Sequence, residues 1–162
     1  MSMTHYMELL ATNQPWNLII YMAIPVILAE TIAIAELYLL FTRNFTGWVK
    51  RISKLAGIIA GAYFVGIFVH LMGSAVIPLT QSAGWRGPID VIAVLSYLAG
   101  VIPLGGIALL ELGLLAQHKT EEERLCLHAI CVGIFLIVAH IAMIFGMLSP
   151  AVFGGGQHTM PM

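Results

Sequence analysis

Two histidines lie deep inside apolar stretches of the chain, where an imidazole could bind a metal or carry a proton. They are His70 and His140. Each follows the last preceding charge, Lys54 or Arg124, by sixteen positions. Sixteen residues correspond to about 24 Å along a helix that rises 1.5 Å per residue. The spacing therefore predicts two imidazoles at one depth of a membrane.

Four further ionisable residues lie within the apolar stretches. Ionisable side chains in hydrocarbon cost roughly 2.5 to 3.5 kcal/mol each, so they usually face the interior of a helix bundle and mark function. Counted from the nearest basic loop residues, three of these four lie only about 6 to 12 Å into the membrane. We therefore predict an upper layer of Glu30, His70 and His140 and a lower layer of Glu36, Glu111 and His128.

The lower layer also permits a simpler interpretation. Glu36 and Glu111 lie near enough to the interface to extend toward Lys and Arg side chains. We expect His128 to be interfacial rather than catalytic. In the upper layer, a membrane histidine can also serve only to bond a Ser, a Tyr or a backbone carbonyl.

Glycines accompany the ionisable residues. A glycine beside a buried imidazole leaves a slot that a flat macrocycle could fill, and a haem needs one histidine on each face. With these features the chain resembles b-type membrane cytochromes, which implies one haem b between His70 and His140. Glycines in membrane helices also serve close packing, as the pair Gly57 and Gly61 is spaced to do. The candidate cofactor-binding glycines are Gly66, Gly100 and Gly133.

The haem hypothesis implies electron transfer, in a membrane oxidoreductase subunit that exchanges electrons with quinone. Arg86 would bind the haem propionates. Glu30 would be the catalytic group that tunes the potential or handles a proton.

Two other functions fit the same residues. His70, His140 and Glu30 would suit a transition metal such as Cu, Fe or Zn, and the lower layer would continue a path for that metal or for protons. Alternatively, the chain is a non-catalytic assembly subunit whose polar residues meet partner helices. Four helices are few for an independent transporter, so we expect a homo-oligomer or other membrane subunits as partners.

Composition defines the fold class. The chain has 162 residues, of which 60% are hydrophobic and 9% charged, and its mean hydropathy of +0.96 lies outside the range of soluble domains. We predict an all-α integral membrane protein, a bundle of four helices in the lipid bilayer. The net charge of -1 gives no indication of nucleic-acid binding. The expected helices are residues 16–41, 55–79, 91–115 and 125–147, within a transmembrane domain of residues 16–149.

The basic residues predict the orientation. Six of the seven lie in the first and third loops, and such loops stay cytoplasmic. Both termini would then lie outside a bacterial inner membrane, with residues 1–15 as a polar lead and residues 150–162 as a mobile outer tail. We read no signal peptide at the start of the chain. The segment around Glu36 aligns with that around Glu111, which suggests two hairpins related by a pseudo-two-fold axis.

Overall fold

The computed structural model describes residues 3–149, and every regular element within that range is a helix. Four helical segments are long and apolar enough to cross a membrane, which agrees with the expected all-α fold and the expected number of such helices. The predicted tail, residues 150–162, lies outside the described residues. The four segments are Trp16–Thr42, Trp48–Gln81, Pro88–Glu111 and Glu121–Met147.

Three of the four spans are interrupted. In the first two spans a π-helical turn directly precedes a helix with proline at its second position, Pro25 or Pro78. Proline lacks a backbone N–H and its ring crowds the carbonyl four residues earlier, so a wider turn relieves the clash. The third span changes direction at Gly100. The spans are built from α2 (Trp16–Leu18), η1 (Ile19–Ala23) and α3 (Ile24–Thr42); α4 (Trp48–Leu71), η2 (Met72–Val76) and α5 (Ile77–Gln81); α6 (Pro88–Ala99) and α7 (Val101–Glu111); and α8 (Glu121–Met147).

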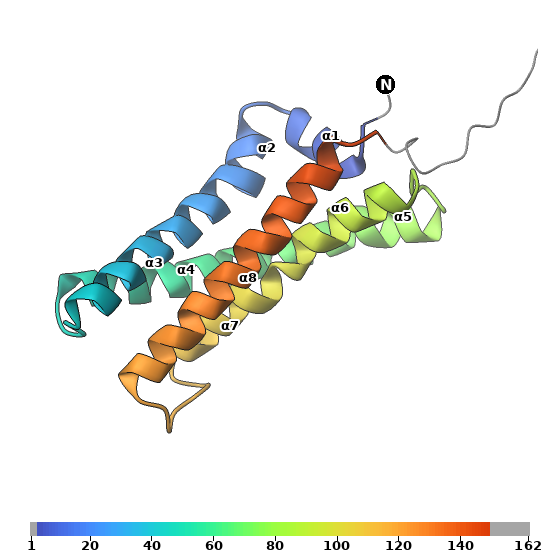
Figure 1. Cartoon of the computed structure of the whole chain (residues 1–162). Helices are drawn as coiled ribbons and strands as arrows, with labels where there is room; N and C mark the ends of the chain where they lie inside the picture. The colour runs from blue at the N-terminus through green and yellow to red at the C-terminus, as the bar shows by residue number, and fades with distance from the viewer. Residues whose placement is uncertain (1–2, 150–162) are drawn as a thin grey trace, which may run out of the picture.

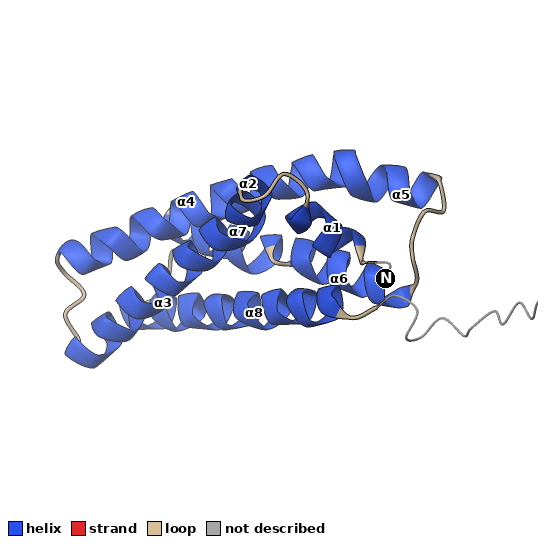
Figure 2. Ribbon diagram, turned by 90° about the horizontal axis from the view of Figure 1, so that it is seen from above, coloured by secondary structure: helices blue, strands red, loops and turns tan. Residues whose placement is uncertain are grey.

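The helices form a bundle in which α4 and α8 run along opposite sides (Figures 1 and 2). Helix α4 packs against α3 and α7, and α8 packs against α3, α6 and α7. The contact between α4 and α7 depends on glycine, because a Cβ at Gly61 would lie 2.6 Å from the carbonyl oxygen of Leu104. The predicted packing role of Gly57 and Gly61 is therefore confirmed.

Part of the polar lead before the first span forms a short helix. Helix α1 (His5–Ala11) packs against α6 and α8, at the end of the bundle where α8 finishes (Figure 1). Tyr6 and Leu10 are both buried on one side of α1. This pair of apolar side chains, four positions apart, explains why the segment docks on the bundle.

The span boundaries differ from the expected ones. The second span begins at Trp48, before the basic residues Lys50 and Lys54, so these are helical and not in a loop. The third ends at Glu111, and Gly113 follows with a φ of 72°, a conformation that ends a helix. The expected capping box of Thr120 and Glu123 is present at the start of α8. We call the end of the bundle that carries the loops between α3 and α4 and between α7 and α8 the basic end. The opposite end is the α1 end.

Candidate functional site

Near the basic end, one ionisable side chain from each of three spans meets in the core. Nδ1 of His128 on α8 lies 2.9 Å from Oε1 of Glu36 on α3 and 3.5 Å from Oε1 of Glu111 on α7. Nδ1 of His128 therefore forms a hydrogen bond with Glu36 and lies within ion-pair distance of Glu111. We call these three residues the Glu–His cluster, and they are the predicted lower layer.

The Glu–His cluster is buried, which corrects the expectation that His128 is interfacial and that Glu36 extends to the interface. Glu36 is 1% exposed and His128 is 3% exposed. Oε2 of Glu36 has no hydrogen-bond partner, and it is the only such buried side-chain N or O atom among the described residues. An unpaired buried carboxylate oxygen is costly. This oxygen of Glu36 is therefore the atom of the cluster that is available to accept a proton.

A cavity of about 120 Å³ connects the cluster with the basic end. Glu111 and His128 lie in its wall, and three basic side chains surround it: Lys50, Lys54 and Arg124. Glu121 also lines the cavity and contacts both Lys50 and Arg124. Positive charges at this mouth oppose a free metal cation, whereas a proton can move along hydrogen-bonded side chains and water.

An apolar layer closes the other side of the Glu–His cluster. Ile32, one turn before Glu36 on α3, is completely buried, and Val132 and Phe135 on α8 are at most 3% exposed. Beyond them, Phe64 contacts Phe135 edge-on. The cluster is therefore open toward the basic end and sealed toward the α1 end.

The predicted upper layer is not brought together. Glu30 and His140 line one cavity, between α3 and α8. His70 lines a different, open groove with Gly66, and its ring stacks on Tyr21 at 6.5 Å. Tyr21 lines both spaces, so η1 stands between the two histidines.

The residues proposed for haem do not fit that group. His70 and His140 are exposed side chains on helices at opposite sides of the bundle (Figure 2). The space beside Gly100 is filled, because its Cβ would lie 3.1 Å from the rings of Phe64 and Phe135. A Cβ added at Gly133 would have no neighbour within 4 Å, so this glycine lies beside open space, but it lines neither the cavity of His140 nor the groove of His70. A haem between His70 and His140, and electron exchange with quinone, stay predictions that this geometry does not support.

The transition-metal alternative gains no support either. The described part of the chain contains no group of three His, Cys, Asp or Glu side chains arranged to hold a metal ion. In the Glu–His cluster both carboxylates contact the same imidazole nitrogen, Nδ1 of His128.

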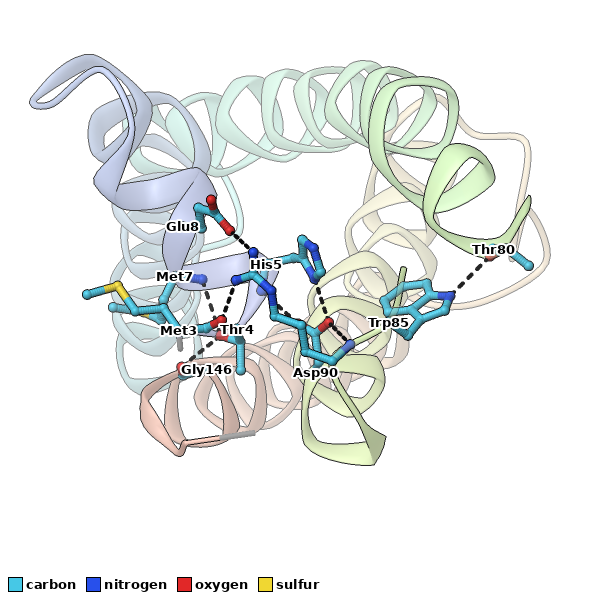
Figure 3. A network of polar contacts seen from close by, with 10 residues as sticks. Met3, Thr4, His5, Met7, Glu8, Thr80, Trp85, Asp90 and Gly146 are labelled. Carbon is cyan, nitrogen blue, oxygen red and sulfur yellow. Dashed lines mark hydrogen bonds and ion pairs between the residues drawn. The ribbon is translucent and has the colours of Figure 1, made fainter. Parts of the chain in front are cut away.

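Arg86 joins a polar network at the α1 end, in which Figure 3 shows His5, Glu8 and Asp90. Its guanidinium contacts Glu8 at 2.6 Å and donates to the carbonyl of Met3. In the same network the hydroxyl of Thr4 donates to the carbonyl of Gly146 at 2.8 Å, which ties the start of α1 to the end of α8. The partners of the Arg86 side chain are therefore residues of the N-terminal segment.

Sequence reasoning missed two features. Asp90 had no predicted partner, but it binds His5 of the N-terminal segment. The tyrosines around η1 also had no predicted role, yet the hydroxyls of Tyr63 and Tyr97 donate to the carbonyls of Ile20 and Tyr21. The signal for the second feature was available, since the carbonyls freed before Pro25 need donors.

Comparison with known proteins gives a family and no activity. No curated protein and no solved structure matches the chain. One family profile, described as a family of unknown function (DUF6803), matches residues 1–162. Since the match covers the whole sequence, this four-span protein with a buried Glu–His cluster belongs to the DUF6803 family.

Proposed function

We propose that this protein conducts protons across a membrane and that the Glu–His cluster is its proton-binding site. The observation that carries the proposal is Glu36, which is 1% exposed and has one unpaired carboxylate oxygen, bound to a histidine that a second glutamate also contacts. Three coupled titratable groups can hold and exchange protons as a unit. Burying them in a membrane is costly unless they serve function.

The route begins at the basic end. The cavity lined by Lys50, Lys54 and Arg124 leads to Glu111 and His128, and His128 leads to Glu36. From the positive-inside rule we infer that this cavity faces the cytoplasm of a bacterium and that both termini lie outside its inner membrane.

The route continues along α3 and α8. Glu30 precedes Glu36 by six residues, or about 9 Å along α3, and His140 follows His128 by twelve, or about 18 Å along α8. The apolar layer of Ile32, Val132 and Phe135 lies between the two pairs. Glu36 and His128 form one level of titratable groups, and Glu30 and His140 form a second level beyond the apolar layer. Protons can then reach each level from one side of the membrane at a time, as a coupled pathway requires, whereas an open pore would connect both sides at once.

Proton flux into proteoliposomes tests the proposal. A potassium gradient with valinomycin sets a membrane potential, and a trapped pH dye reports the flux. We expect Glu36→Gln and His128→Asn to lower the flux at least tenfold. Glu122→Gln is the matched control, because Glu122 is exposed and has no role in the route.

A purely structural role for the cluster predicts a different result. If the three residues only hold α3, α7 and α8 together, the variants lose thermal stability and keep their flux per folded molecule. Flux that persists in well-folded Glu36→Gln protein overturns the proposal.

A further inference from the structure

We propose that the cavity between η1–α3 and α8 binds an organic ammonium ion with a hydrophobic body, whose charge Glu30 holds. The cavity has a volume of about 210 Å³ and lies at the level of the membrane core. Most of its lining is apolar. Its two ionisable residues besides the tyrosines are Glu30 and His140, and its walls include Tyr6, Tyr21, Tyr97, Pro25, Phe135 and Met143.

Glu30 and His140 both present acceptors. The side chain of Glu30 forms no hydrogen bond or ion pair with another described residue. Nδ1 of His140 donates to the carbonyl of Leu136 at 2.6 Å. A carbonyl can only accept, so the neutral imidazole keeps Nε2 as an acceptor. A ligand that satisfies both groups must donate hydrogen bonds.

The charge of Glu30 favours a cation as that donor. The guanidinium of Arg86, the one Lys or Arg near the α1 end among the described residues, is already paired with Glu8. A carboxylate at this depth is costly unless it is neutralised by a proton or a positive partner. An ammonium ion offers both a positive charge and N–H donors.

The aromatic wall suits the same ligand. The hydroxyl of Tyr97 already donates to the carbonyl of Tyr21 at 2.5 Å, so Tyr97 offers the cavity mainly its ring. Tyrosine rings attract cations that lie over their faces. The ring of Tyr6 packs on Tyr97 at 5.2 Å and closes the cavity toward the α1 end.

The ligand would enter from the lipid. Both Glu30 and His140 are exposed residues of membrane-spanning segments, so the cavity is open at the side of the bundle. The π-turn η1 and Pro25 produce this opening, because the widened turn shifts the first span at the level of the cavity. Functional sites often lie at such π-turns.

Calorimetry with the purified protein in zwitterionic lipid nanodiscs tests the site. The probe is 4-phenylbutylammonium, and the neutral alcohol 4-phenylbutan-1-ol, of nearly the same size, measures apolar binding alone. We expect the ammonium to bind at least tenfold more tightly than the alcohol. In Glu30→Gln this preference should fall below twofold.

Proton competition gives an independent readout. Since ammonium and proton would compete for one carboxylate, acidification should weaken ammonium binding in the unmodified protein and have no such effect in Glu30→Gln. Equal binding of the two probes, or a preference that survives Glu30→Gln, overturns the proposal. Tighter binding of a neutral hydroquinone such as duroquinol overturns it too, and assigns the cavity to hydroquinones.

The cation site shares Glu30 and His140 with the proposed proton route but does not include the Glu–His cluster, so variants of Glu36 separate the two proposals. Glu36→Gln should abolish proton flux and leave the ammonium preference unchanged. If the flux measurements fail and the preference remains, the protein binds organic cations without conducting protons. If the ammonium preference is absent and the proton flux is intact, the cation-site proposal is overturned and the proton-conduction proposal stands.

Discussion

His5 and Asp90 form an ion pair that joins the N-terminal helix to the third membrane span. Nδ1 of His5 lies 2.6 Å from Oδ2 of Asp90, whose side chain is completely buried. The backbone N–H of His5 donates to the other carboxylate oxygen, also at 2.6 Å, and the N–H of Arg86 donates at 3.2 Å. One carboxylate thus fixes both the start of α1 and the loop before α6.

We expect Asp90→Asn to loosen α1. The amide keeps the size of the side chain but loses the charge, and hydrogen bonds to charged groups contribute about 1.5 to 3 kcal/mol. Amide hydrogen exchange in residues 5–11 should therefore accelerate at least tenfold in detergent micelles, as mass spectrometry can measure. Glu122→Gln is the control. Unchanged exchange in α1 would show that the apolar face of this helix, not Asp90, holds it in place.

High pH should also destabilise the docking of α1, through Tyr6. Burial raises the pKa of Tyr6 to about 12 from the ordinary value of 10.0. The folded state therefore favours the neutral phenol. Its stabilising contribution is complete below pH 10 and is lost as the pH rises toward 12, because the unfolded chain releases the proton first.

The magnitude follows from the two-unit difference in pKa, which corresponds to about 2.7 kcal/mol. We expect the free energy of unfolding, measured by SDS titration, to fall by about 2 kcal/mol between pH 9.5 and 11.5. In Tyr6→Phe this part of the decrease should disappear. An identical pH dependence in both proteins would mean that the Tyr6 phenol gains water at the α1 end.

Two glycines of α4 should respond in opposite directions to the same substitution. A Cβ at Gly61 would lie 2.6 Å from the carbonyl oxygen of Leu104, whereas one at Gly66 would have no neighbour within 4 Å. Gly61→Ala should cost about 1 to 3 kcal/mol in unfolding free energy through overpacking. Gly66→Ala should be neutral or stabilise by up to about 1 kcal/mol through helix propensity. Equal effects would contradict the close contact of α4 with α7.

The sequence predicts the four spans because membrane thickness imposes a length on each apolar run. It also predicts the Glu–His cluster as a layer, since depth follows from counting residues to the nearest charge. What it could not supply is the rotation of each helix. In a soluble protein the polar face reveals that rotation, but here lipid and core are both apolar, so the burial of His128 leaves no pattern.

The same limit explains the upper layer. His70 and His140 share a depth, and depth alone suggested that they face each other. The π-turn before Pro25 places Tyr21 between their two spaces. Whether a proline in a membrane helix produces a simple kink or a π-turn depends on the donors nearby, here Tyr63 and Tyr97. Those donors lie 43 and 76 positions along the sequence from the carbonyls that they bind, Ile20 and Tyr21.

Glu36 and His128 should be energetically coupled. His128→Ala leaves the Glu36 carboxylate buried with no partner, and breaking a buried pair in this way costs roughly 3 to 5 kcal/mol. Adding Glu36→Met to that variant removes the stranded charge. The double variant should therefore be more stable than His128→Ala alone, with a coupling energy of about 1 to 3 kcal/mol in SDS titrations.

Glu111 provides the comparison within the same cluster. It lies 3.5 Å from His128 rather than 2.9 Å, and its side chain is 11% exposed against 2% for Glu36. Water and the basic side chains of the adjoining cavity can stabilise Glu111 when His128 is removed. We therefore expect the coupling of Glu111→Met with His128→Ala to be at most half that of the Glu36 pair. Equal coupling energies would mean that the two carboxylates interact equally with the imidazole. Glu36 would then have no special role in the proton-binding site.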